Sequence, residues 1–324
     1  MVSEESCISV SATVSRILVG GCRASGGGLH LGHVYGCFHE VTVDSGVQYF
    51  FVISDCIDAP REQIDKNISS IFIDVLSAAQ FPLYIVRESK LRRDLYRLEI
   101  EIERTMPFSR LRDAHPQRRE IKRGTYSKTV SDLVFPVHQA SFLLGLGCEV
   151  ACFNDDNRDA VSFAREAGRR LLLKRNIPAL ALPRLMERIP GRLESWDGRR
   201  MAKINRNYLA ISASPLDVEK FARRLTGGAV PIGASFEESM ISEREQVYVR
   251  LMGADTSKMA GLTGHDRLRM FSKLLLSYMD ATQDKRVLAA QAWDEASISA
   301  SLQENEAIAG NRIARVLDRM GIGQ

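Results

Sequence analysis

The stretch from Cys22 to Gly36, CRASGGGLHLGHVYG, constrains the fold of this chain more than any other segment. It follows an apolar run at residues 16–20, RILVG, which predicts a first strand. The glycines let the backbone turn tightly and approach a ligand without side-chain obstruction. A helix is expected to begin near Leu31 and to run to about Glu40. Strand, turn and helix N-terminus together suit phosphate binding, because free N–H groups and the positive end of the helix dipole face an anion.

The glycines do not follow the common nucleotide-binding patterns. Their spacing and the histidine pair do not match the dinucleotide fingerprint, and the Gly-Lys-Ser/Thr ending of a Walker P-loop is missing. His30 and His33 are three residues apart, so they share one helical face from which both rings can point at a polyphosphate. Taken alone, a His-x-x-His pair is more commonly a structural pair than a binding site.

Strands and helices alternate through the first half of the chain. A nearly continuous apolar run at 47–54 suits a parallel strand that is covered on both faces. Ser89 is predicted to be the N-cap of the helix that follows the third strand. Further strands are expected at 82–87 and 148–153, and helices at 61–80, 90–104, 130–146 and 156–174. This order predicts an α/β protein with a Rossmann-like, doubly wound parallel sheet.

The pattern becomes all helical from about Pro215. We therefore expect an N-terminal extension at 1–15, a Rossmann-like domain at 16–214 and a C-terminal all-helical domain at 215–324. The length of 324 residues suits two domains.

Composition narrows the class of protein only slightly. The chain is 45% hydrophobic and 26% charged with a net charge of +4, which is compatible with nucleic-acid binding but does not require it. No apolar run is long enough to span a bilayer, and no signal peptide is evident, so we expect no membrane association. Six scattered cysteines indicate a cytoplasmic protein. A zinc site at Cys148, Cys152 and His138 is disfavoured, because a second well-spaced ligand pair is missing.

Three further segments carry a family resemblance. Residues 197–205 read DGRRMAKIN and precede Asn207; residues 135–144 read FPVHQASFLL, and residues 154–157 read NDDN. With the histidine stretch, they resemble in order and separation the signatures of class I aminoacyl-tRNA synthetases of the tryptophanyl type. Residues 305–322 resemble the last helix of that family. The resemblance covers most of the chain and implies the class I synthetase fold, whose helical domain lies against the tRNA anticodon arm.

The resemblance implies a catalytic group of four residues. His30 and His33 would donate to the ATP triphosphate as charge builds in the transition state. Lys203 would neutralise the leaving pyrophosphate, and Arg200 occupies the first lysine position of the family's Lys-Met-Ser-Lys-Ser loop. Both serine positions of that loop are apolar here, as Ala202 and Ile204.

The nucleotide-binding residues implied by the resemblance are Ser25, Gly32, Asp156 and Met201. Ser25 would add a hydroxyl donor in the turn, Gly32 would let adenine sit close to the helix, and Asp156 would accept from the ribose. As an alternative, Asp156 is simply the N-cap of the following helix. The implied cofactors are ATP and Mg²⁺, with Mg²⁺ bridging phosphates rather than bound by protein side chains.

The implied amino-acid pocket departs from the family pattern. Phe135 replaces a tyrosine and Asn157 replaces a glutamine, both of which help to hold the substrate amino group in the family. Gln139 stands in place of a methionine, and Phe142 in place of the aspartate that accepts the indole N–H. Loss of a buried acceptor changes selectivity as well as affinity. The alternative is that Phe142 only repacks while Gln139 serves the indole.

A basic segment spans residues 108–128. It is either a solvated surface or a cover over ATP and the tRNA acceptor stem, since basic residues position phosphates. Arg110 or Arg112 would then stand in for the family's ATP-contacting lysine.

Three functions remain open. The first is a tryptophanyl-tRNA synthetase that activates its amino acid with ATP and charges tRNA. The second is a paralogue that activates another amino acid for natural-product or peptide-bond formation, and the third is a non-catalytic regulator that binds tRNA or an amino acid. The presence of His30, His33, Lys203 and Asp156 together argues against the regulator, because a pure binding protein has no need for a lysine that neutralises a leaving group. The resemblance also implies a homodimer.

Overall fold

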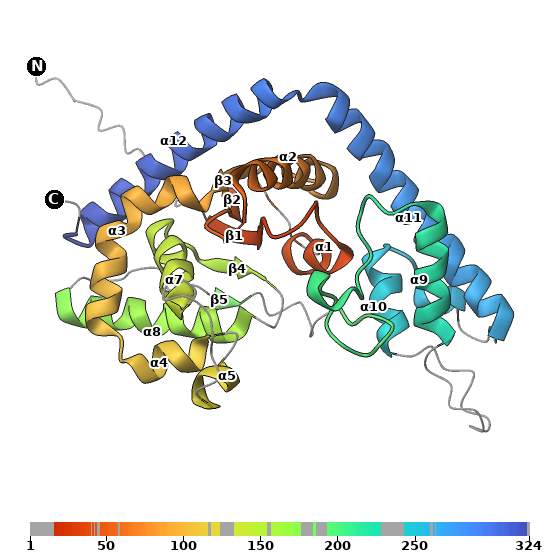
Figure 1. The fold of residues 1–324 in the computed structure, drawn as a ribbon, viewed down its shortest axis with the longest axis horizontal. Coiled ribbons are helices and arrows are strands. Elements are labelled where there is room, and N and C mark those ends of the chain that lie inside the picture. The colour runs from red at the N-terminus through yellow and green to blue at the C-terminus, as the bar shows by residue number, and fades with distance from the viewer. Residues whose placement is uncertain are drawn as a thin grey trace, which may run out of the picture.

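The computed structural model describes residues 16–39, 41, 43, 46–57, 59–115, 118–123, 133–153, 157–175, 184–185, 193–227, 243–259, 262 and 264–322. The expected N-terminal extension at 1–15 lies outside these residues. Figure 1 shows a sheet with helices on both faces and a group of helices to one side.

The sheet has five parallel strands in the order β3-β2-β1-β4-β5. Their bounds are β1 (Arg16–Arg23), β2 (Val47–Ser54), β3 (Tyr84–Arg87), β4 (Val150–Cys152) and β5 (Arg184–Leu185). The strand order reverses at β1, because the chain first adds strands on one side of it and then on the other. A crevice beyond the carboxyl ends of the strands is expected at such a switch point. The predicted doubly wound α/β class is confirmed.

The strands separate two apolar cores. Along β2, Tyr49, Phe51 and Ile53 belong to one core, and Phe50 and Val52 belong to the other. All five side chains are at most 1% exposed, because helices cover both faces of this parallel strand. The apolar run predicted as a doubly covered strand is therefore confirmed.

The helices of the first half follow the expected alternation. They are α1 (Leu31–Cys37), α2 (Arg61–Ala78), α3 (Glu88–Thr105), α4 (Phe108–Ala114), α5 (Arg118–Arg123), α7 (Phe135–Gly145) and α8 (Arg158–Arg175). Helix α1 ends three residues earlier than expected, and the backbone N–H groups of Phe38 and His39 both donate to Val34 O in its final turn.

The predicted N-cap at Ser89 is wrong, because α3 begins two residues earlier than expected, at Glu88, and its N-cap is Arg87. The Ser89 backbone N–H donates to Asp55 Oδ1 at 2.8 Å, and its hydroxyl donates to Asp55 Oδ2 at 2.5 Å. The capping acceptor is thus supplied from the end of β2, a contact that local sequence cannot reveal.

The second half contains α9 (Pro215–Gly227), α10 (Glu243–Leu251), α11 (Gly264–Ala292) and α12 (Glu295–Arg319), with short 3₁₀ turns η2 (Lys203–Asn205) and η3 (Thr256–Met259). Helix α11 runs beside α9 and crosses to α2, after which α12 arches back over α2 towards α3 (Figure 1). None of the described helices is both long and apolar enough to cross a membrane.

Helix α12 is fixed to the sheet side of the molecule. Arg87, at the end of β3, makes two hydrogen bonds to Glu306 at 2.6 and 2.9 Å. Arg312 Nε donates to Leu146 O at 2.6 Å, at the end of α7. A helix that comes last in the sequence thereby packs against both cores, with Ile298 and Leu302 in one and Ala309, Ile313 and Leu317 in the other. The division of the chain at residues 214 and 215 stays a prediction.

Candidate active site

The turn between β1 and α1 is held from two sides. Gly28 has φ +63°, and a Cβ added to it would clash with Asp74 Oδ2 from α2. That same oxygen accepts a hydrogen bond from the Leu29 backbone N–H at 2.6 Å. Glycine is therefore required at this position, both for the left-handed conformation and for the close approach of the carboxylate.

Lys203 braces the turn from the opposite side. Its Nζ donates to Gly26 O at 2.9 Å and to Gly28 O at 2.6 Å. The ammonium of Lys203 thus contacts a segment that lies about half of the sequence away. This contact brings together the two predicted signatures, the Gly-rich stretch at 22–36 and the loop at 197–205, which we call the second signature loop. Burial lowers the pKa of Lys203, whereas Cys22 and Asp74 act in the opposite direction.

The two predicted histidines form one stacked pair. His30 is the N-cap residue of α1, and its ring lies 3.8 Å from that of His33 between centroids, with an interplanar angle of 24°. The His30 backbone N–H donates to His33 Nδ1 at 3.3 Å. A neutral His33 ring with this acceptor carries its proton on Nε2, which is then free to donate elsewhere.

Both rings are neutral near pH 7. Burial, with Lys203 and Arg200 nearby, lowers the pKa of His33 to about 3. Burial and the neighbouring His33 hold the pKa of His30 well below its usual value. His30 Nδ1 is buried and has no hydrogen-bond partner among the described residues. The pair can therefore offer hydrogen bonds to an anion, but it does not offer positive charge.

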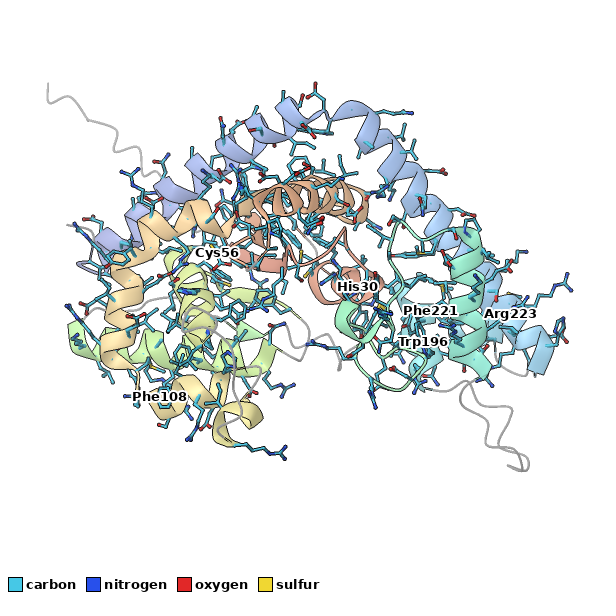
Figure 2. All side chains as sticks on the ribbon, viewed as in Figure 1. His30, Cys56, Phe108, Trp196, Phe221 and Arg223 are labelled. Atoms are coloured by element: carbon cyan, nitrogen blue, oxygen red, sulfur yellow. The ribbon has the colours of Figure 1, made fainter. Side chains whose placement is uncertain are left out.

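Backbone hydrogen bonds join the segment at 209–211, which follows Lys203, to the histidine segment. Leu31 N donates to Leu209 O at 3.0 Å, and Ile211 N donates to Leu29 O at 3.1 Å. His30 lies at the edge of α1 that faces the helices and loop carrying Phe221 and Trp196 (Figure 2). These backbone bonds fix the position of the second signature loop relative to the first.

Asn207 organises the second signature loop, a role that the sequence analysis did not assign. Its Oδ1 accepts from Ala202 N at 2.9 Å, and its Nδ2 donates to Arg200 O at 3.0 Å and to Asp197 Oδ1 at 2.9 Å. The side chain is 1% exposed. Spacing alone could have raised it as a candidate, because an Asn just after a polar loop can bond to that loop's backbone.

Met201 and Gly32, two predicted nucleotide-binding residues, contact each other. The Gly32 backbone N–H donates to Met201 Sδ at 3.3 Å. A Cβ added to Gly32 would lie 3.0 Å from the His30 ring and 3.5 Å from Met201 Cβ, so a larger residue would require the ring to shift by a few tenths of an ångström. The structure thus places the two residues together at the start of α1.

Two more predicted residues lie at the rim. Arg200 and Ser25 are exposed, Arg200 in the second signature loop and Ser25 in the Gly-rich turn. The positive charge of Arg200 contributes to the lowered pKa of both histidines. Asp156 lies outside the described residues, so its predicted ribose contact stays a prediction.

The predicted amino-acid pocket residues separate into two groups. Gln139 and Phe142 lie on α7 with exposures of 8% and 3%, and Phe142 belongs to the core that α3 and α8 share. Phe135, at the start of α7, lies 4.2 Å beneath the guanidinium of Arg23 at the end of β1. Asn157 is half-buried just before α8.

A buried polar pair joins α7, which carries the pocket residues, to α3. His138 Nδ1 is 3.1 Å from Glu99 Oε1 on α3, and Ser141 Oγ donates to the same oxygen at 3.2 Å. Burial opposes a low pKa for Glu99, but His138, Arg92 and Ser141 lower that pKa. The structure thus places His138 against Glu99. Within the described ranges, no three His, Cys, Asp or Glu side chains are arranged to hold a metal ion.

The described part of the basic segment forms ion pairs. Arg110 on α4 pairs with Glu166 on α8, and Lys122 on α5 lies 3.0 Å from Asp113. Arg112 lies 3.4 Å from the same Asp113. The role of the basic segment at 108–128 as a cover over ATP stays a prediction.

Solved structures show what this chain resembles. The tryptophanyl-tRNA synthetase from Mycoplasma pneumoniae superposes with a TM-score of 0.78 at 14% identity, covering 95% of this chain and 97% of that one. The Campylobacter jejuni enzyme, complexed with ADP and tryptophan, gives 0.67 at 17% identity, covering 94% and 99%. The Archaeoglobus fulgidus tyrosyl-tRNA synthetase, complexed with L-tyrosine, gives 0.54 at 16% identity, covering 94% and 90%.

No protein-family model matches this sequence, and no curated protein matches it by sequence either. The chain therefore has the class I fold of tryptophanyl- and tyrosyl-tRNA synthetases, as its motifs predicted, at a sequence identity that shows the fold alone.

Proposed function

We propose that this protein is an aminoacyl-tRNA synthetase-like ligase that uses ATP to convert an amino acid to its adenylate and then transfers the amino acid to the 3′ end of a tRNA. One observation carries the proposal. Lys203, from the second signature loop, lies on the carbonyls of the Gly-rich turn, which ends at the stacked His30–His33 pair. The cationic Lys203 beside two neutral donors suits a triphosphate whose charge shifts during reaction.

The proposed chemistry is a displacement at phosphorus. A carboxylate oxygen of the amino acid attacks the α-phosphorus of ATP, the bond to the bridging oxygen breaks, and pyrophosphate leaves with the electron pair. Protein groups have little covalent work in such a step, so positioning and charge neutralisation dominate. Lys203 would neutralise the departing pyrophosphate, and His33 Nε2–H would donate to a phosphate oxygen.

The donor set fits ATP better than it fits a protein-bound metal. Lys203 and the two histidines supply donors and one positive charge, whereas the described residues contain no cluster of metal ligands. In this proposal Mg²⁺ would accompany ATP and supply further charge neutralisation. Ser25, Gly32, Met201 and Asp156 are proposed to contact the nucleotide.

A second candidate is activation of an amino acid other than tryptophan. It is favoured by Phe142, which supplies an apolar, buried ring where the resemblance expects an acceptor for the indole N–H. The Arg23 guanidinium lies over the Phe135 ring, which puts a positive charge beside one of the proposed pocket residues. The adenylation step is the same for both candidates, which differ in the amino acid and in the acceptor.

Amino-acid-dependent exchange between ATP and pyrophosphate tests the proposal, with all standard amino acids and several aromatic analogues. Exchange with tryptophan, followed by tRNA charging, supports the first candidate, and exchange with another amino acid only supports the second. A folded protein that binds ATP but shows no exchange contradicts both and favours the regulator. A homodimeric, cytoplasmic protein with tRNA as partner completes the proposal.

A further inference from the structure

The carboxylate of Asp74 joins three parts of the chain. The side chain is on α2 and is 0% exposed. Its Oδ2 accepts from the Leu29 backbone N–H at 2.6 Å, and its Oδ1 accepts from Arg286 Nε on α11 at 2.6 Å. Leu29 is 45 residues away in sequence and Arg286 is 212 residues away. One buried group thus connects the Gly-rich turn to a helix of the C-terminal half.

A buried carboxylate is tolerated only where it is paired and hydrogen-bonded. Burial raises the pKa of Asp74, whereas Arg286, the Leu29 amide and Lys203 act to lower it. Arg286 is therefore the partner that keeps a charged acceptor available for Leu29 N. Without that guanidinium, protonation of Asp74 would weaken its hold on the turn.

Helix α11 also contacts the segment that follows the second signature loop. Gln283 precedes Arg286 by three residues, which places both on one face of α11. Gln283 Nε2 donates to Ala213 O at 2.8 Å, two residues beyond the backbone bond between Ile211 and Leu29. One face of α11 therefore holds both segments that flank the candidate site.

We infer that Arg286 is a positioning residue, which acts through Asp74 to fix the Leu29 amide and the turn on which Lys203 rests. The geometry of the nucleotide side then depends on where α11 lies against α2. A shift of α11 would release the turn and weaken ATP binding before it changed the amino-acid side, because α7 belongs to the opposite core. The ATP-related part of this inference rests on the proposed function.

The test uses the full chain with Arg286→Gln, Arg286→Lys and Asp74→Asn. Two exposed residues provide matched controls: Lys285→Gln on α11 and Asp65→Asn on α2. Arg286→Gln is expected to raise the KM for ATP by about tenfold and to leave the KM for the amino acid within about twofold. Arg286→Lys should recover part of this loss, because it restores the charge without the planar guanidinium.

Hydrogen exchange gives a readout that does not need turnover. Peptides covering residues 24–38 should exchange their amide hydrogens faster in Arg286→Gln and Asp74→Asn, and at the wild-type rate in both controls. Equal changes in both KM values, or turn peptides that exchange as in the wild type, would overturn the inference. Thermal melting identifies variants that are simply unfolded, in which case Arg286→Lys carries the test.

The two proposals can fail separately. If the wild-type protein shows no ATP–pyrophosphate exchange with any amino acid, the proposed function is contradicted. Hydrogen exchange and titration with a fluorescent ATP analogue still decide the role of Arg286. If Arg286→Gln shows wild-type ATP–pyrophosphate exchange and unchanged ATP affinity, only the positioning role is removed.

Discussion

The Gly-rich turn and helix α7 meet at Arg23, but different kinds of contact hold them in place. The turn is fixed by charged side chains that bond to its backbone: Asp74 to Leu29 N and Lys203 to two glycine carbonyls. Helix α7 is fixed by apolar packing, with Phe142 in the core and one buried polar pair, His138 and Glu99. Backbone contacts demand few side-chain identities, whereas a packed pocket depends on every residue that lines it.

This difference shows how one half of the proposed site could keep the expected family pattern while the other departs from it. The proposed nucleotide side would need glycines, a lysine and two imidazoles, and the sequence has all of them. The proposed amino-acid side departs from the expected pattern at several side chains of α7. We therefore expect perturbations of the turn to affect ATP chemistry strongly, and perturbations of α7 to affect mainly the choice of amino acid.

Lys203→Ala should have the largest effect. Loss of a donor that acts on the transition state typically lowers kcat by about 10²–10³-fold. ATP affinity should fall far less, because the histidines remain and Asp74 still holds the turn at the Leu29 backbone N–H. Pyrophosphate exchange and ATP titration, with the exposed Lys285→Ala as control, measure the two effects. Equal losses of exchange and of ATP affinity would remove the leaving-group role.

Gly28→Ala tests the close approach of Asp74 to the turn. The positive φ and the clash with the carboxylate should together cost about 1–3 kcal/mol of folding free energy and weaken ATP binding. Gly27→Ala is the matched control, because a Cβ there meets nothing within 4 Å. Urea denaturation should separate the two variants. Similar stability in both would mean that the turn is not braced by Asp74.

The histidine pair predicts how stability depends on pH. The pKa of His33 is about 3 in the folded protein and about 6.5 when unfolded, so the unfolded chain binds the extra proton between these values. Stability should therefore be fully present above pH 6.5 and fall as the pH decreases towards 3, by on the order of 2 kcal/mol at pH 5 from this residue.

Urea denaturation at pH 7, 6 and 5 checks this dependence, with His33→Gln losing the His33 contribution. The matched control is His265→Gln, because His265 lies on α11 in the C-terminal half. A wild-type slope that His33→Gln leaves unchanged would show that the pair is not held neutral.

Phe142→Asp should give the smallest effect on rate and the clearest effect on selectivity. A restored acceptor should raise kcat/KM for tryptophan relative to phenylalanine by about tenfold, at a cost in stability because the site is buried. Phe142→Leu, which changes volume without adding an acceptor, is the control. Unchanged selectivity in a folded Phe142→Asp variant would mean that residue 142 does not face the substrate.

Much of this arrangement could be predicted from local sequence. The strand at 47–54 was predicted with its correct bounds, because its apolar run is nearly continuous, and the pairing of the histidines followed from their spacing. The start of α3 was missed because its capping contact comes from Asp55, 34 residues away. The link between Asp74 and Arg286 could not be inferred either, because neither residue lies in a recognisable motif and only the folded chain brings them together.

Amino-acid-dependent ATP–pyrophosphate exchange by the purified full chain tests most directly whether the two signatures form one adenylation centre. We predict exchange with at least one amino acid, with Lys203→Ala lowering it by about 10²–10³-fold and Lys285→Ala leaving it unchanged. A folded protein that binds ATP yet exchanges with none of the standard amino acids or aromatic analogues would contradict the proposed chemistry.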